Sequence, residues 1–390
     1  MQRIKIEEIE SMRSPGRMSG SMSGTSNSQK DQITTSQTAV MVINYMLGAG
    51  ILTLPRTIVE ATKTPDVWIS ILISGTIILA SCWIIVKLCS RFQGQTLFQF
   101  LPEITGKGIA MLINILIISY FLTISAFEIR IMAEVTGFYL LEGTPSWAIV
   151  MTFMWIGLYL ILGGISCIAR LYEIILPITL VFFLIAILLS SRIFDIDHLR
   201  PVLGSGMMPV LKGIKPSLLS FAGYEILLVA LAYMKNPGKA NKAMVAGVTA
   251  PVVIYLITVI MVIGGLSING LEKRTWPTLD LMRSFEVQGL IFERFESLLL
   301  VIWIMQIFST FTVTHYAASL GWSQMFKRNF RPFVFAMLPV IYLIAMVPKD
   351  INQVFNLGSM FGIVSVYLFG GVPLILLFVS ILRKKGAKPK

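Results

Sequence analysis

The stretch Ile33–Thr62 reads ITTSQTAVMVINYMLGAGILTLPRTIVEAT and is apolar over a length that can cross a bilayer. Gly48-Ala49-Gly50 lies at its centre, and Pro55 follows. A glycine inside a helix costs about 1 kcal/mol relative to alanine, and a proline removes a backbone donor. Lipid offers no hydrogen bonds, so a helix break at this depth is tolerated only where the freed N–H and C=O groups face protein, water or a ligand. The stretch therefore predicts half of a binding site built from helix ends.

The composition is that of a polytopic membrane protein. Of the 390 residues, 55% are hydrophobic and 13% are charged, and the mean hydropathy is +0.79. A soluble core does not need so many apolar runs of twenty residues. The net charge of +12 comes from short basic clusters between the apolar runs, which is the pattern of the positive-inside rule. This distribution argues against nucleic acid as a partner.

The apolar runs predict an all-α integral membrane protein with ten transmembrane helices inside residues 33–383. Residues 1–32 carry mixed charge and a Ser/Gly/Met repeat without an apolar core, which predicts a disordered cytoplasmic tail and excludes a secretory signal. Residues 384–390 form a basic cytoplasmic tail. The ten segments lie at about 36–61, 67–90, 108–138, 146–164, 167–190, 208–234, 243–267, 296–321, 332–347 and 357–382.

Lysine and arginine positions predict the orientation. With the N-terminus in the cytoplasm, the inner stretches hold 19 of the 32 basic residues and the outer loops hold ten. Both termini are then cytoplasmic. The inner loop 91–107 and the outer loop 268–295 are amphipathic, and each predicts a short helix at the membrane surface.

A second break occurs in the sixth segment. It reads PSLLSFAGYEILLVALAYM from Pro216 to Met234, with Ala222 and Gly223 near its centre. Breaks at corresponding positions of two five-span halves indicate an inverted-repeat transporter fold with a site where the broken helices meet. The repeats are then about 36–190 and 208–382. The alternative is that the small residues only permit close helix packing.

The exposed helix ends predict the chemistry of the site. Beyond the first break, the amides of Gly50, Ile51 and Leu52 can bind a carboxylate at the positive end of a half-helix. The carbonyls that end the preceding half-helix can hold an ammonium group or a cation. A zwitterionic amino acid matches this arrangement.

Polar and aromatic residues near the breaks are further candidates for ligand binding. Glu225 either complements the dipole of its half-helix or contacts a ligand ammonium or carries a proton. The hydroxyls around Thr310 either bind Na⁺ or ligand or satisfy carbonyls of their own helix. One face of the third segment carries three candidates, which are Tyr120, Thr123 and Ile124. In the sixth segment, the aromatic residues Phe221 and Tyr224 set the size of the pocket.

Two charged pairs are expected in the outer half of the membrane. Arg130 and Glu134 are spaced to pair on one helix. Arg56 and Glu128 lie at comparable depth, and we hypothesise that they pair across an outer vestibule as a gate. The alternative is that each reaches a loop or a headgroup independently.

The sequence gives no sign of an enzyme. It contains no phosphate loop with lysine, no nucleophile elbow and no HExxH motif. The cysteines and histidines lack metal-ligand spacing, so no metal and no cofactor are expected: Cys82, Cys89, Cys167, His198 and His315. The fifth segment has no lysine at mid-depth, so ion coupling has no clear carrier.

Three stretches resemble the spore germination B-subunit family, the endospore germination permeases. They are Ile33–Arg56, the segment HLRPVLGSG with the following SFAGYE, and Trp276–Phe308, which reads WPTLDLMRSFEVQGLIFERFESLLLVIWIMQIF. The resemblance covers about residues 33–383 and implies a LeuT-like fold of the amino acid–polyamine–organocation superfamily. The positions that match the family are Gly48 to Ile51, Tyr120, Ile124, Ala222 to Glu225 and Thr310.

The resemblance implies a nutrient germinant receptor subunit in the spore inner membrane. Such a subunit binds a small germinant, typically an amino acid, and works with an A subunit and a C-subunit lipoprotein to signal germination. The rival function is a proton- or sodium-coupled amino acid transporter of the same fold.

Overall fold

The structure is a computed structural model that describes residues 31–284 and 295–386. Gln32–Lys390 form one compact unit. The predicted tail 1–32 and the last four residues of the basic tail lie almost entirely outside the described residues, as does the part of the outer loop from 285 to 294.

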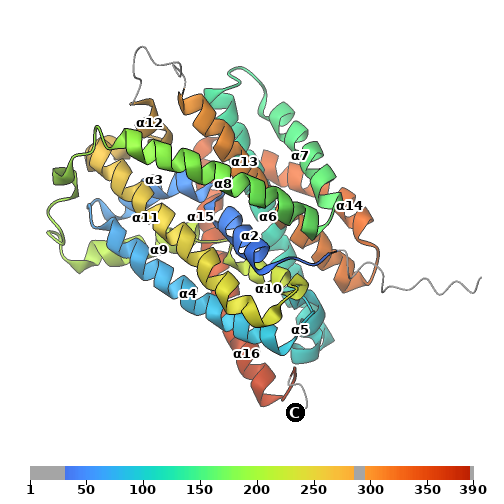
Figure 1. Ribbon diagram of the computed structural model, residues 1–390. Helices are drawn as coiled ribbons and strands as arrows, with labels where there is room; N and C mark the ends of the chain where they lie inside the picture. The colour runs from blue at the N-terminus through green and yellow to red at the C-terminus, as the bar shows by residue number, and fades with distance from the viewer. Residues whose placement is uncertain (1–30, 285–294, 387–390) are drawn as a thin grey trace, which may run out of the picture. The chain divides into compact units, whose positions relative to one another are not determined.

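Every predicted membrane segment coincides with a helix or with a bent helix pair (Figure 1). The first half of the chain contains α2 (Thr35–Leu47), α3 (Gly50–Thr62), α4 (Val67–Arg91), α6 (Lys107–Tyr139), α7 (Ser146–Leu162) and α8 (Ile165–Ser190). The second half contains α9 (Met207–Ser220), α10 (Leu227–Ala230), α11 (Ala240–Glu272), α13 (Phe295–Phe326), α14 (Phe330–Met346), α15 (Ile351–Ser365) and α16 (Val372–Leu382).

Six helical stretches in the described part of the chain are long and apolar enough to cross a membrane, the last of them running through α15 and α16 together. The pair α2 and α3 bends by 48° at its break, and the pair α9 and the Tyr224–Tyr233 segment bends by 46°. If each bent pair is one span, the number of spans is eight. The helices α7 and α14 have 17 residues each, so the full count of ten crossings stays a prediction.

The most buried long helix is α13, which packs along α6 in the centre of the bundle. Its span is 83% buried, whereas those of α8 and of α15 with α16 are 28% buried. Large apolar side chains are exposed on the outer helices, including Tyr159 at 86% and Leu188 at 71%. Lipid is the medium that stabilises such a surface. The broken helices lie inside, where α2 contacts α8, α11 and α13 and α3 contacts α9.

The two predicted surface helices are present as short elements. The inner loop forms α5 (Leu97–Thr105), which begins with a capping box between Thr96 and Gln99. The outer loop forms α12 (Pro277–Arg283), which starts with proline, the residue whose fixed φ suits a first helical turn.

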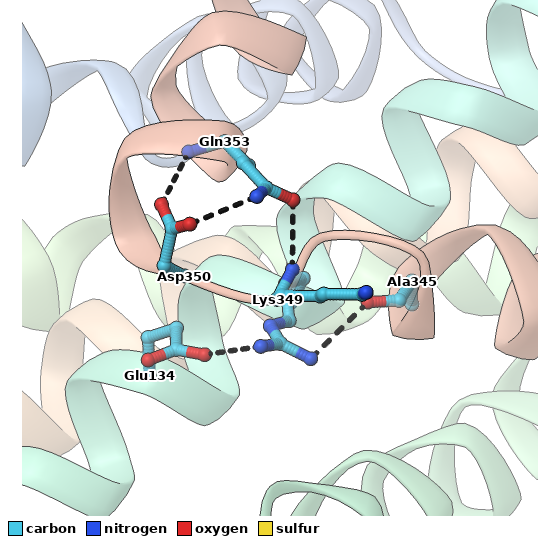
Figure 2. A network of polar contacts seen from close by, with 6 residues as sticks. Glu134, Ala345, Lys349, Asp350 and Gln353 are labelled. Atoms are coloured by element: carbon cyan, nitrogen blue, oxygen red, sulfur yellow. Dashed lines mark hydrogen bonds and ion pairs between the residues drawn. The ribbon is translucent and has the colours of Figure 1, made fainter.

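The predicted pair between Arg130 and Glu134 is confirmed, with 2.7 Å between Arg130 Nη2 and Glu134 Oε1. Arg130 Nη1 also donates to the carbonyl of Ala345 at the end of α14. Figure 2 shows this contact beside the start of α15, where the carboxylate of Asp350 accepts the N–H of Gln353. Of these bonds, the one from Arg130 to Ala345 joins α6 to the last turn of α14.

Candidate functional site

The first break separates α2 from α3 at Gly48 and Ala49. A Cβ on Gly48 would lie 2.5 Å from Thr310 Oγ1 and 3.0 Å from Glu128 Oε1. The first distance is shorter than real Cβ contacts, and the second is a tight contact. The glycine is therefore needed because a hydroxyl from α13 and a carboxylate from α6 approach the backbone here.

The second break follows Ser220, the last residue of α9. Gly223 has φ +130°, a backbone conformation that other residues rarely adopt. A Cβ at this position would lie 2.8 Å from the backbone N of Met46. The second break thus packs directly against the last turn of α2, so the two breaks meet as predicted.

The carbonyl end of α2 is occupied by side-chain donors of the protein. Gln306 Nε2 donates to Asn44 O at 3.0 Å, and Thr310 Oγ1 donates to Tyr45 O at 3.2 Å. The hydroxyl of Tyr255 donates to Met46 O. It also lies within hydrogen-bond reach of the carbonyls of Leu47 and Ser220, at 3.5 and 3.2 Å. These donors compete with a ligand ammonium or a cation for the carbonyls of Asn44, Tyr45 and Met46. The expectation that the carbonyls hold such a group stays a prediction.

The amide end of α3 is only partly occupied. The N–H of Ala49 donates to both oxygens of the Glu128 carboxylate, at 3.2 and 3.4 Å. The N–H of Leu52 bonds to Ala49 O at 3.1 Å, so its predicted availability to a ligand is wrong. Gly50 and Ile51 occupy the first two positions of α3, which has no side-chain cap. Amides at these positions have no partner within their own helix.

Glu225 is fully buried at the second break. Its Oε1 accepts the hydroxyls of Tyr45 at 2.8 Å and Tyr120 at 2.7 Å, and its Oε2 accepts the N–H of Gly223 at 2.7 Å. The carboxylate thus joins α2, α6 and the broken sixth segment. Three donors satisfy it, and this favours the interpretation in which it stabilises the start of its half-helix.

A cavity of about 320 Å³ reaches both breaks. Six of the predicted residues line it: Gly48, Ala49, Gly50, Ile124, Glu128 and Ala222. Its walls also include Thr53 and Thr57 of α3, Leu219 and Ser220 of α9, and Phe355, Gly358 and Gly362 of α15. The broken half-helices and α6 therefore enclose one volume that is accessible to a small molecule.

The other predicted residues lie outside the cavity lining. Seven of them are buried: Ile51, Tyr120, Phe221, Gly223, Tyr224, Glu225 and Thr310. Thr123 donates to Ser119 O at 2.5 Å on its own helix. Phe221 packs against the ring of Tyr255.

The hypothesised pair between Arg56 and Glu128 does not form. Arg56 Nε lies 2.7 Å from Glu60 Oε1, and its guanidinium lies over the ring of Phe355. Arg56 thus pairs with a carboxylate four residues along its own helix, and Glu128 turns inward to the N–H of Ala49. The gating role of the two residues stays a prediction.

Three of the four hydroxyls between Ser309 and Thr314 on α13 bond to their own helix, as the commoner alternative predicted. Ser309, Thr312 and Thr314 donate to carbonyls four residues earlier. Thr310 is different because its hydroxyl reaches the carbonyl of Tyr45 on α2.

Sequence reasoning missed Tyr255 and Gln306, which hold the end of α2. A polar side chain in the middle of an apolar segment is the signal that could have drawn attention to each of them. Their targets could not have been named, because Met46 and Asn44 lie more than two hundred positions away in the chain. The cavity wall from α15 was also missed, since Gly358 and Gly362 read as ordinary small residues of a membrane helix.

The arrangement of helices is that of the LeuT-like transporters, a class of multi-pass membrane protein. The crystal structure of MhsT in complex with L-phenylalanine matches with a TM-score of 0.68 and 11% identity over 89% of this chain and 97% of that one. Mhp1, a nucleobase-cation-symport-1 family transporter with bromovinylhydantoin bound, matches with a TM-score of 0.66 and 15% identity over 91% and 80%. At these identities the likeness shows the fold alone.

The chain belongs to the spore germination protein family, whose model matches residues 32–354. It is 52% identical to the spore germination protein YndE of Bacillus subtilis over 93% of this chain and 99% of that protein. It is 37% identical to the spore germination protein A2 of the same organism, over 91% and 97%. The relatives are thus germination proteins and the fold neighbours are transporters.

Proposed function

We propose that this protein is the germinant-binding B subunit of a nutrient receptor in the spore inner membrane, with both termini in the cytoplasm. The observation that carries the proposal is the cavity of about 320 Å³ at the two breaks. It lies at the small end of the range for ligand pockets. The amide donor of Gly50 and the Glu128 carboxylate meet there, so the cavity suits a small zwitterion such as an amino acid.

Binding at this site is then reported to partner proteins. A ligand that contacts α3, α6 and α15 together favours the conformation in which these helices lie close, and only such a differential affinity can shift an equilibrium between states. The partners are the A subunit and the C-subunit lipoprotein that the family resemblance implies.

The rival function is amino acid transport coupled to protons or sodium. Transporters of this fold bind a coupling cation at the carbonyl ends of broken helices. In this chain Gln306, Thr310 and Tyr255 already donate to the carbonyls at the end of α2. This occupation favours the receptor over a sodium-coupled carrier.

Reconstitution of the purified chain in liposomes tests the proposal. We expect binding of a labelled amino acid without concentrative uptake under either a sodium or a proton gradient. The variant Gly50→Val places a larger side chain against Tyr255 and serves as the binding-deficient control. Concentrative uptake by the wild-type chain would establish the transporter instead.

A spore germination panel tests the signalling step. A strain that lacks this chain is expected to lose the response to one class of germinant and to keep its response to the others. An unchanged response to every germinant would contradict the receptor role.

A further inference from the structure

We infer that Glu128 is the residue that binds the ammonium group of the ligand. The inference deepens the proposed function and rests on it, because it names the chemical group that the cavity at the two breaks recognises. It starts from the charges in and around that cavity.

The Glu128 side chain is a buried carboxylate with few partners. The residue is 6% exposed, and its oxygens accept the single N–H of Ala49, at 3.2 and 3.4 Å. None of the ion pairs in the described part of the chain involves Glu128. A buried carboxylate without a cation is costly because its lost hydration is not replaced. The partial positive charge at the start of α3 offsets only part of this cost.

The other charged groups around the cavity do not fill this role. Arg56 is paired with Glu60 at 2.7 Å. Lys215 lines the cavity but is exposed to solvent. Glu225, the other buried carboxylate near the breaks, accepts three donors and lies outside the cavity lining. Among the described residues that line the cavity, Glu128 is therefore the acidic group that lacks a cation.

The position of Glu128 also fits the shape of an α-amino acid. Its carboxylate is bound to the N–H of Ala49, and the amide of Gly50, which also lines the cavity, comes next along the same helix start. An α-amino acid carries its ammonium and carboxylate groups on one carbon atom. A ligand carboxylate on the amide of Gly50 therefore brings the ammonium toward Glu128. At the end of α2 the ammonium would compete with three side-chain donors for the carbonyls of Asn44, Tyr45 and Met46, whereas the Glu128 carboxylate accepts the single N–H of Ala49.

The inference predicts that the cavity selects ligands by their amine. Primary amines bind even without a carboxylate, and amino acids with an acylated nitrogen bind weakly. A charge-assisted hydrogen bond in a buried site corresponds to a factor of roughly 10 to 100 in affinity. The variant Glu128→Gln keeps the shape of the side chain and removes the charge that the ammonium requires.

Thermal unfolding of the purified full chain in detergent tests the assignment. The probes are the common amino acids one at a time, the N-acetyl derivative of any that binds, and ethylammonium chloride against an equal concentration of sodium chloride. We expect N-acetylation to weaken binding to the wild type about 10- to 100-fold, and ethylammonium to raise the unfolding temperature. In Glu128→Gln the amino acid should bind about 10- to 100-fold more weakly, and the effects of N-acetylation and ethylammonium should disappear.

The matched control is Glu173→Gln. Glu173 is a half-buried carboxylate on α8 that accepts one hydrogen bond, from Gln37 at 3.0 Å, and lies outside the cavity lining. This variant should bind all probes as the wild type does. If Glu128→Gln does not fold, the wild type alone still shows whether the cavity recognises the ammonium group. The comparison is then between the free amino acid, its N-acetyl derivative and ethylammonium, which lacks the carboxylate.

The outcomes separate this assignment from the proposed function. An amino acid that binds wild type and Glu128→Gln equally, with the same penalty for N-acetylation, overturns the role of Glu128 and leaves the receptor proposal intact. Stabilisation by ethylammonium through Glu128 without binding of any amino acid supports the assignment and overturns the amino acid receptor. A wild-type chain that binds none of the probes overturns both.

Discussion

Tyr255 is the side chain that links the two breaks. Its hydroxyl lies among carbonyls of α2 and α9, the two half-helices that end at the site. Because one hydroxyl carries one hydrogen, it donates to a single carbonyl at a time. Gly50 allows this contact, since a Cβ on residue 50 would overlap the Tyr255 oxygen and lie 3.0 Å from Ser220 O. The glycine at this position is thus needed for packing as well as for the break.

A double-mutant cycle between residues 50 and 255 tests this contact. Gly50→Ala should lower the free energy of unfolding by about 1–3 kcal/mol because the new methyl group overlaps the tyrosine hydroxyl. Tyr255→Phe should cost about 1–2 kcal/mol because Met46 O loses its donor. In the double variant the overlap is gone, so the combined loss should be smaller than the sum by about 1 kcal/mol. Thermal unfolding in detergent measures each variant.

The control for this cycle is Gly108→Ala. A Cβ on Gly108 meets nothing within 4 Å, so this variant should not lower the unfolding temperature of the wild type, and it should not add to the loss caused by Tyr255→Phe. Strictly additive losses for residues 50 and 255 would contradict the contact.

The broken helices differ at their two kinds of end. The carbonyl end of α2 is occupied by donors from α11 and α13, whereas the amide end of α3 receives a single carboxylate. A ligand therefore finds unpaired donors at the start of α3 and few open acceptors at the end of α2. This difference explains why the site suits an anionic group on the amides and has no evident place for a coupling cation.

Because side chains already donate to the α2 carbonyls, we expect the unfolding temperature of the wild-type chain to be insensitive to sodium. For the wild type, replacing choline chloride with sodium chloride should leave the unfolding temperature unchanged. In Gln306→Glu, a carboxylate replaces the N–H donor beside Asn44 O, so a cation is needed between the two oxygens. About 100 mM sodium should then stabilise the variant by roughly 1–3 kcal/mol if it binds in the millimolar range.

Gln306→Met is the control because it removes the donor without adding a charge. It should be less stable than the wild type and equally insensitive to sodium. A sodium-dependent rise in the unfolding temperature of the wild-type chain would show that a cation displaces these donors.

For the whole molecule, the helical bundle exposes an apolar surface and carries its basic residues in clusters between helices. The positive-inside rule assigns the face with Lys242 to the cytoplasm and the face with Lys349 to the opposite side. The breaks lie within apolar segments between these faces, and the cavity extends from them to Lys215 and Glu60, at the same side as the predicted outer loops.

Cysteine labelling checks this orientation. Cys82, Cys89 and Cys167 are first replaced, since Cys167 is exposed. Lys349→Cys should react with a membrane-impermeant maleimide in intact cells, whereas Lys242→Cys should react only after permeabilisation. Both lysines are exposed in the structure, so burial does not limit either reaction. The reverse labelling pattern would invert the topology and put the cavity mouth on the inner side.

The sequence by itself determined the all-helical membrane class, the helical segments and the positions of both breaks. These features depend on local properties of the chain. The length of an apolar run belongs to one continuous segment, and the weak helix propensity of glycine acts at its own position. Only the tertiary structure decided which groups face the helix ends. Glu128 was expected to pair with Arg56 and instead accepts the N–H of Ala49, and Tyr255 and Gln306 were not expected at the site. These contacts join residues 79 to 262 positions apart, and such pairings are set by how the helices pack.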